Sequence, residues 1–245
     1  MERLRENQSW SKKYPMSTQY VLKEVNTLVK ETRKNIAYQN LKDAILTWTI
    51  LPGSPIVEQQ ISDQLGISRT PVREALKLLE AEGLVKVISQ RGTFVSDLST
   101  QDVEEIFALR VSLEVQALQV AILNIPLDQL IELELFLNSL TPESPSEQFF
   151  KSDRMLHAII VNHGENERLS HFLDSLNVQV ERVRRISAMM PKRLDLSMRE
   201  HIGILQAIKA RDAVAAESKL REHIQNVKQS TLDVCRNLWW QNKGD

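Results

Sequence analysis

Apolar residues recur every three or four positions along most of this 245-residue chain. The pattern is clear over residues 18–34 and hardly lapses from residue 99 to residue 238. This spacing puts the apolar side chains on one face of a helix. Turn-forming residues interrupt the longer run at 124–126, 141–146, 163–166 and 190–195. The second half of the chain is therefore expected to be a bundle of about six helices without strands.

The segment between these regions has a different order. A helix through Leu41 and Ile45 ends at the Leu-Pro-Gly-Ser turn of residues 51–54. A short helical stretch from Glu58 to Leu65, a Gly66 turn and a second helix follow, and alternating apolar positions near 84–88 and 93–96 predict two strands. The order is helix, turn, helix, wing.

The second of these helices is expected to start at Ser68, because serine can accept a bond from an amide of the first helical turn. Arg69 and Arg73 then lie one turn apart on one face, while Val72 and Leu76 lie on another. Guanine offers two acceptors to an arginine in the major groove, and recognition helices present their N-terminal residues to base edges. A groove-binding helix is therefore indicated, although surface ion pairs of Arg73 with Glu74 or Glu80 are the plainer alternative.

Composition is that of an ordinary globular protein, with 42% hydrophobic and 26% charged residues and a single cysteine, Cys235. One cysteine excludes an intramolecular disulfide and fits a reducing cytoplasm. No apolar run approaches the length needed to span a bilayer, and the N-terminus lacks a signal-peptide core. We expect a cytoplasmic protein with no membrane partner.

The net charge of −1 is unevenly divided. Residues 1–34 hold eight basic against four acidic side chains, an excess of four positive charges, while the segment 35–97 is close to neutral. This N-terminal extension either packs on the protein or acts as a basic arm on phosphates. DNA binding by the neutral segment would depend on a few arginines and on dimerisation, with a strong dependence on salt.

A long ordered signature runs from Leu65-Gly66-Ile67-Ser68-Arg69-Thr70-Pro71-Val72-Arg73-Glu74-Ala75-Leu76 to Arg91-Gly92-Thr93-Phe94-Val95. It resembles the winged helix-turn-helix of GntR-family bacterial transcription regulators. The resemblance implies that operator DNA is bound by residues of the second helix, its neighbour and the wing, namely Ser68, Arg69, Thr70, Arg73, Gln59, Arg91 and Gly92. Many relatives carry arginine where this chain has Gln59, so the operator cannot be copied from them. Gly92 also suits a tight wing tip that needs a positive φ.

Four possible metal ligands lie in the helical half of the chain. Asp153 and His157 are one turn apart on a helix that begins near Ser146, and His201 and His223 lie on two later helices. Nitrogen and oxygen donors of this kind suit Zn, Ni or Mn. Taken alone the histidines could equally be ordinary core or surface residues.

The order of these residues, with Arg110-x-x-x-Glu114 before them and Arg211-Asp212 between the last two, resembles the FCD effector domain of one GntR subfamily. The resemblance implies a metal held by Asp153, His157, His201 and His223, and a small carboxylate as effector. An arginine near the metal would pair with such a ligand. Arg110 is the first candidate and Arg182 the second, although Arg182, Arg184 and Arg185 could simply form a solvated helix face.

The expected architecture is mainly α. It comprises a basic extension (1–34), a winged helix-turn-helix domain (35–97), an FCD-type helical domain for effector binding and dimerisation (98–238) and a tail (239–245). The function indicated is a ligand-responsive DNA-binding transcription regulator, a homodimeric repressor on a two-fold operator rather than an enzyme. A metalloenzyme built on the same Asp/His site, and a bundle that serves dimerisation only, are the alternatives.

Overall fold

The computed structural model describes residues 32–241, with side chains to residue 237. The described chain falls into two compact units, one ending at Leu98 and the other beginning at Ser99. The expected amphipathic helix over 18–34 lies largely outside the described residues. Arg33 and Lys34, its last residues, belong to the first described helix instead.

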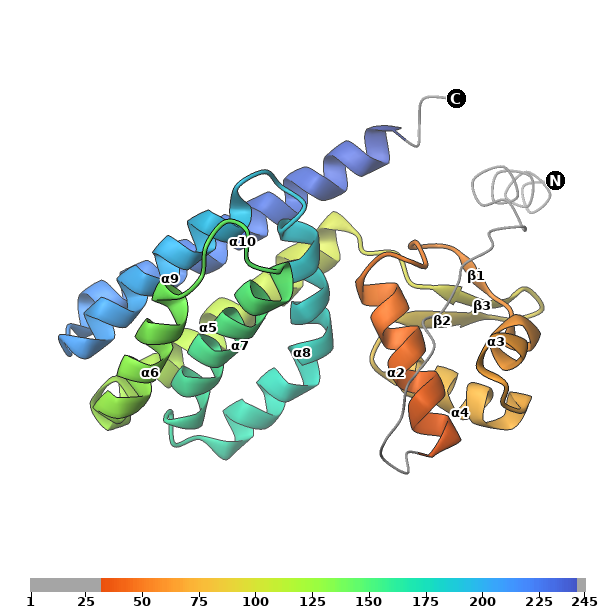
Figure 1. The fold of residues 1–245 in the computed structure, drawn as a ribbon, viewed down its shortest axis with the longest axis horizontal. Coiled ribbons are helices and arrows are strands. Elements are labelled where there is room, and N and C mark those ends of the chain that lie inside the picture. The colour runs from red at the N-terminus through yellow and green to blue at the C-terminus, as the bar shows by residue number, and fades with distance from the viewer. Residues whose placement is uncertain (1–31, 242–245) are drawn as a thin grey trace. The chain divides into compact units, whose positions relative to one another are not determined.

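The described part of the first unit contains three helices and a small sheet (Figure 1). The helices are α2 (Arg33–Leu46), α3 (Glu58–Leu65) and α4 (Arg69–Ala81). Helix α4 packs against α2, α3 and strand β2. Its apolar face, which includes Val72, Ala75 and Leu79, is fully buried. The unit therefore holds α4 by one side only and leaves its other side exposed.

The sheet has three antiparallel strands in the order β1-β3-β2, formed by β1 (Pro55–Ile56), β2 (Val85–Ile88) and β3 (Gly92–Val95). Strands β2 and β3 make the expected wing, with Val85 opposite Val95. Strand β1 was not expected from the sequence, because two residues are too few to show an alternating pattern.

The second unit is helical throughout its described part and consists of α5 (Thr100–Asn124), α6 (Leu127–Asn138), α7 (Ser146–Asn162), α8 (Glu167–Ser187), α9 (Arg193–Lys209) and α10 (Ala213–Gln241). Breaks are present at or near all four expected places, although the one expected at 190–195 lies at 188–192. A fifth break, at 210–212, was not expected. Helix α10 packs against α5, α8 and α9, and α5 packs against α7 and α8 (Figure 1). Helix α10 continues past the expected end at Leu238 to Gln241. The prediction of a mainly α protein with a small wing is confirmed.

Helix α5 begins with a capping box, in which Ser99 and Asp102 bond each other's backbone amides. One expectation about this helix was wrong: by length and composition alone α5 could cross a membrane, with a mean hydropathy of 1.6. Half of that apolar window is buried inside the bundle. The packing of α5 on α7, α8 and α10 accounts for the buried half, while Leu109, Val120 and Leu123 remain exposed.

Arg211 lies in the turn between α9 and α10. Its φ is 55°, in the left-handed region where glycine is favoured. Its guanidinium donates to the carbonyl oxygens of Ile122 and, at 2.9 Å, Ile125. These carbonyls end α5, so the arginine compensates for its backbone conformation by capping a neighbouring helix.

Candidate functional site

Helix α3 and helix α4 are joined by a short turn that Gly66 makes possible. Gly66 has a φ of 63° and ends α3 with a left-handed residue. Ser68 occupies the position before α4, as expected, but within the described chain its hydroxyl accepts no bond from the first turn. The hydroxyl is therefore not used to stabilise the helix end.

The outer face of α4 carries the arginines that the sequence singled out. Arg69, Thr70 and Arg73 are all exposed. Arg69 donates from Nε to Oε1 of Gln59 at 2.5 Å, and Arg73 donates from Nε to Oε2 of Glu58 at 2.6 Å. The acidic partner of Arg73 is thus on α3 and is neither Glu74 nor Glu80. An exposed ion pair contributes only ~0–1 kcal/mol, so DNA can compete for this arginine.

The wing tip lies between β2 and β3. Arg91 is exposed there, and Gly92 has a φ of 108°, the positive value that the tight tip was expected to need. Gln90, just before them, also has a positive φ, of 62°. The tip is thus a compact turn that presents Arg91 to solvent.

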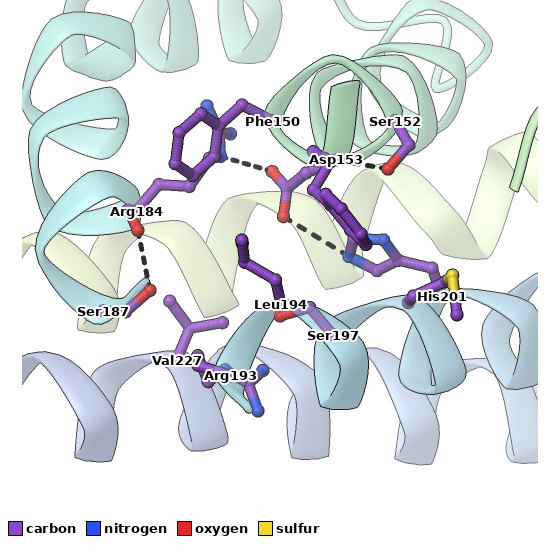
Figure 2. A pocket seen from close by; sticks show the side chains of 12 residues that line it. Phe150, Ser152, Asp153, Arg184, Ser187, Arg193, Leu194, Ser197, His201 and Val227 are labelled. Carbon is purple, nitrogen blue, oxygen red and sulfur yellow. Dashed lines mark hydrogen bonds and ion pairs between the residues drawn. The ribbon is translucent and has the colours of Figure 1, made fainter. Parts of the chain in front are cut away.

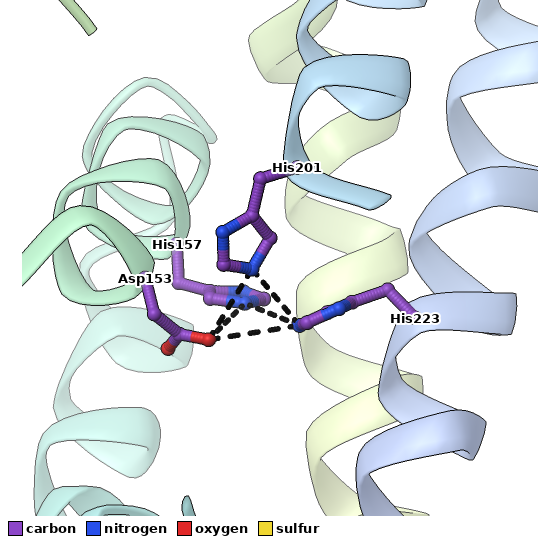
Figure 3. A group of neighbouring side chains, drawn as sticks. All are labelled: Asp153, His157, His201 and His223. Atoms are coloured by element: carbon purple, nitrogen blue, oxygen red, sulfur yellow. Dashed lines mark hydrogen bonds and ion pairs between the residues drawn. The ribbon is translucent and has the colours of Figure 1, made fainter. Parts of the chain in front are cut away.

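Four side chains from three helices converge in the helical unit (Figure 3). Asp153 and His157 come from α7, His201 from α9 and His223 from α10, and one ligand atom of each lies within 4.8 Å of all the others. All four are buried. The sequence-predicted set is therefore brought together completely.

The distances within the cluster fit a metal ion. Nε2 of His223 lies 3.4 Å from Nε2 of His157 and 3.3 Å from Nε2 of His201. Oδ1 of Asp153 lies 3.3 Å from Nε2 of His201, 3.7 Å from Nε2 of His223 and 3.8 Å from Nε2 of His157. Ligand atoms placed tetrahedrally ~2.0–2.1 Å from a zinc ion are ~3.3–3.4 Å apart. Three imidazole nitrogens and a carboxylate oxygen are also a suitable donor set for zinc, nickel or manganese.

The outward atoms of three of these ligands are held by other charged side chains. His157 Nδ1 bonds Glu114, which is itself held by Arg110 Nε at 2.6 Å. His223 Nδ1 lies 2.7 Å from Oε2 of Glu200. A carboxylate behind the outer ring nitrogen fixes that nitrogen as the N–H and leaves Nε2 to face the metal.

The Glu200 carboxylate is held in turn by Arg193, whose Nη1 donates to Oε1 at 3.0 Å and whose Nη2 donates to Oε2 at 2.5 Å. Asp153 is held by an ion pair without hydrogen-bond geometry, with its Oδ2 2.6 Å from Nε of Arg184. The fourth ligand differs: Nδ1 of His201 is buried and has no hydrogen-bond partner among the described residues. Three ligands are braced and one is not.

The charges around the cluster agree with this arrangement. Burial alone would raise the pKa of Glu114, but the Arg110 guanidinium and His157 lower it to about 2. Burial lowers the pKa of His157, against the pull of Glu114, and burial together with His223 lowers the pKa of His201 to about 4. The pKa of the ligand carboxyl of Asp153 is also held well below its usual range, against burial, by the Arg184 guanidinium. Asp153 is thus ionised, and the imidazoles of His157 and His201 are neutral near pH 7, the states that bind a metal.

The two arginines expected to meet an effector are both buried. Arg110 is 1% exposed, and its two terminal nitrogens have no hydrogen-bond partner within the described part of the chain. Arg182 is 2% exposed and Arg184 is 8% exposed, so the alternative of a solvated helix face was wrong for both. Helix α8 is covered on this side by α5, α7 and α10.

A small cavity lies against the cluster (Figure 2). Its polar lining includes Asp153 and His201, the two arginines Arg184 and Arg193, and Ser152, Ser187 and Ser197. Neither Arg110 nor Arg182 lines it. The space admits water, and a metabolite of several heavy atoms would fit only if lining side chains moved.

Comparison with known families identifies both halves of the chain. A family model described as bacterial regulatory proteins, gntR family, matches residues 33–95, and one described as FCD domain matches residues 105–226. HTH-type transcriptional regulator YdhC of Bacillus subtilis (strain 168) is 30% identical over 193 residues, 76% of this chain and 85% of YdhC. The chain belongs to the GntR family and carries an FCD domain.

Other relatives of this GntR regulator agree. HTH-type transcriptional repressor RspR of Escherichia coli (strain K12) is 27% identical over 80% of this chain and 88% of its own. The solved structure of E. coli McbR/YncC matches with a TM-score of 0.66 at 23% identity, over 85% of this chain and 99% of the other. The metal-free FCD domain of TM0439 matches with a TM-score of 0.54 at 23% identity, over 58% of this chain and 99% of the other.

Membership of this family answers one question left open by the sequence. The matched families and relatives are transcription regulators, so the Asp/His cluster does not belong to a metalloenzyme and the protein is a regulator. Glu200 and His201 are adjacent on α9, so their side chains point apart. Glu200 nevertheless reaches the site through His223 on the neighbouring helix.

Four charged residues at this site were not recognised as part of it from the sequence: Glu114, Arg184, Arg193 and Glu200. Glu114 and Glu200 stood within the motifs that indicated the family, and a carboxylate near each histidine is what a metal ligand ordinarily needs. That rule was the available signal. The sequence contains many carboxylates, however, and only the packing of α5 on α7 and of α9 on α10 selects these two.

Proposed function

We propose that this GntR regulator is a ligand-responsive repressor that works in the bacterial cytoplasm. It binds a two-fold operator as a homodimer, and a small carboxylate in the FCD domain changes its affinity for DNA. Family membership supports transcription regulation, and RspR, one of its relatives, is named a repressor. Symmetric half-sites follow from a symmetric dimer.

The proposed DNA-binding surface consists of the start of α4, its neighbour on α3 and the wing tip. Arg69 and Arg73 read base edges, because both are exposed on the side of α4 that the unit does not cover. The other members of the surface are Ser68, Thr70, Gln59, Arg91 and Gly92. Replacing Arg73 by alanine is expected to cost ~1–3 kcal/mol of operator affinity and to relax the preference at one base position.

The observation that carries the sensor half of the proposal is the convergence of four buried ligand atoms beside a cavity. Asp153, His157, His201 and His223 would hold Zn, Ni or Mn, and the metal would supply a Lewis-acidic centre for a carboxylate. Asp153, His157 and His223 already meet charged side chains through their outer atoms, but their inner atoms and Nε2 of His201 face one another in a buried site. Acceptor atoms grouped in this way are costly unless a cation lies between them, which supports a bound metal.

For the effector we propose a carboxylate that enters the cavity next to Asp153 and His201. Arg184 and Arg193 line this cavity and are better placed to meet it than Arg110 or Arg182. The unpartnered terminal nitrogens of Arg110 keep that residue as a candidate should the bundle open further. A guanidinium pairs with a carboxylate through two parallel hydrogen bonds.

The effector acts by a difference in affinity between two arrangements of the regulator, one that fits the operator and one that does not. A metabolite that bound both arrangements equally well could not shift the equilibrium between them. The remaining alternative, a bundle that serves dimerisation only, predicts no response of DNA binding to any ligand.

Bound metal, measured by elemental analysis of protein purified without an affinity tag, tests the site. Wild type is expected to carry near-stoichiometric metal and His201→Ala to lose most of it. His171→Ala is the matched control, because His171 is exposed on α8 away from the cluster. Absence of metal from wild type after reloading with Zn, Ni and Mn would remove the metal site from the proposal.

A screen of carboxylates against operator binding then tests the effector. Metal-loaded wild type should release or gain DNA with at least one carboxylate, and His157→Ala should lose this response while keeping its DNA affinity. If saturating carboxylates never change operator affinity, the bundle is a dimerisation domain and the sensor proposal is wrong.

A further inference from the structure

The first two residues of α3 each hold one arginine of α4. Glu58 accepts from Nε of Arg73 at 2.6 Å, and Gln59 accepts from Nε of Arg69 at 2.5 Å. In both pairs the bond uses the inner nitrogen of the guanidinium. The two outer nitrogens of Arg69 make no hydrogen bond to the described chain, so its fork remains available.

The amide of Gln59 is itself oriented. Its Nε2 donates to Oδ1 of Asp63, one turn further along α3, at 2.6 Å. With the nitrogen bound to that carboxylate, the amide oxygen is the atom that faces Arg69. The two linked hydrogen bonds, from Gln59 to Asp63 and from Arg69 to Gln59, therefore set the direction of the Arg69 guanidinium. Both acceptors lie on α3, the helix before α4.

This arrangement matters for DNA because guanine is read by two parallel N–H groups of an arginine. An exposed arginine that rotates freely must be ordered when it binds, whereas one that is already held by Nε has lost much of that freedom beforehand. The side chain of Gln59 would then improve recognition without touching a base.

Resting on the proposed DNA-binding function, we propose that Gln59 is a positioning residue that determines specificity by holding the Arg69 fork toward one base pair. It acts through Arg69 and not by a base contact of its own. The arginine common at this position in relatives could not do this, since a guanidinium has no acceptor and would repel Arg69. The departure of this chain at residue 59 thus changes the role of the position.

Charge separates the two pairs further. Glu58 carries a negative charge that offsets the charge of Arg73, whereas the neutral amide of Gln59 leaves the full positive charge on Arg69. Arg69 is consequently the stronger attraction for guanine or phosphate. A carboxylate in place of the amide would keep the acceptor and reduce that attraction.

The test is selection of binding sequences from a randomised duplex DNA pool by the full-length protein, followed by sequencing. Arg69→Ala defines the base position that Arg69 reads. Gln59→Ala is expected to lower discrimination at that same position by ~2–12-fold, the ordering cost of one side chain, and to leave other positions unchanged. Gln60→Ala is the matched control, since this neighbouring amide has no hydrogen bond to either arginine in the described structure.

Gln59→Glu separates positioning from charge. It is made together with Asp63→Asn, because a carboxylate at position 59 could not donate to Asp63 and would repel it. The double variant keeps an acceptor for Arg69 that is itself hydrogen-bonded, so the selected base should remain the same while affinity falls for all sequences. Two results would overturn the inference: unchanged preference in Gln59→Ala, or a change only at positions that Arg69→Ala leaves intact. Wild-type protein that enriches no sequence would instead contradict the proposed function itself.

Discussion

Removing the charge of Glu200 provides the sharpest test of how the FCD site holds a metal. Glu200 accepts from Nδ1 of His223 at 2.7 Å and is held by Arg193 and, at 2.9 Å, by Asn226. Burial would raise the pKa of this carboxyl, but His223 and Arg193 lower it to about 2, so it is ionised near pH 7. Glu200→Gln keeps the shape and an acceptor and loses the charge.

The expected effect follows from the position of Glu200 behind a metal ligand. Loss of such a partner typically weakens metal binding 10–100-fold, or ~1.4–2.7 kcal/mol. The dissociation constant for zinc, measured by competition with a chelator, should therefore rise by about that factor. The absorption spectrum of the cobalt-loaded protein should also change, because His223 is no longer held in one orientation.

Glu134→Gln is the control for a general loss of stability. Glu134 on α6 makes an interhelical ion pair of 2.6 Å with Lys209 on α9 and has no contact with a ligand of the cluster. Both variants remove one partly buried ion pair, but only Glu200→Gln should affect zinc. Equal zinc affinity in wild type and Glu200→Gln, with the same cobalt spectrum, would refute the role of Glu200 in holding His223.

Three further predictions concern stability. Gly164→Ala should lower the free energy of unfolding by ~1–3 kcal/mol, since the added Cβ would lie 2.9 Å from that of Ala117. Gly203→Ala, inside helix α9, should raise it by ~0.5–1 kcal/mol, because the added Cβ would come no closer than 3.5 Å to another residue, the flexible end of Lys219. Thermal denaturation compares the two variants, and equal behaviour would contradict the packing argument. Arg211→Gly should relieve the strain of a left-handed backbone, ~1 kcal/mol, and lose two hydrogen bonds from a charged group to carbonyl oxygens, ~1.5–3 kcal/mol each. The free energy of unfolding, measured by urea titration, should therefore fall. A more stable variant would show that capping of α5 by Arg211 contributes little. The folded pKa of Glu114 is about 2, below its unfolded value of ~4.3, so its ionised form stabilises the metal-free protein above pH ~4.3 and this stability is lost as the pH falls toward 2. In Glu114→Gln the free energy of unfolding should therefore depend less on pH between these two values. An unchanged pH dependence would count against the pairing of Arg110 with Glu114.

Much of the DNA-binding unit could be predicted because its signals are local. The expected bounds of α3, Glu58 to Leu65, and the start of α4 after Ser68 agree with the structure. A helix end depends on a few neighbouring residues and on one glycine in the left-handed region, and these are visible in sequence. The partners of Arg69 and Arg73 were not visible, because they lie on another helix.

The metal cluster was also indicated in advance, but for a different reason. Asp153 and His157 share a helix face by their spacing, while His201 and His223 were connected to them only through a resemblance to the FCD domain. No spacing along the chain places residues from α7, α9 and α10 in one cavity. The structure brings the four together, and what they bind remains a prediction.

The amino-acid sequence by itself determined the periodicity, the turns and the order of the motifs, since each depends on residues within one or two turns of one another. Tertiary structure alone decided which of many carboxylates stand behind the histidines, that Arg182 and Arg184 are buried, and that half of the apolar window of α5 is buried in the bundle. These features depend on how each helix is rotated against its neighbours. That rotation is set by the packing of all the buried faces together, and no single segment of the chain contains it.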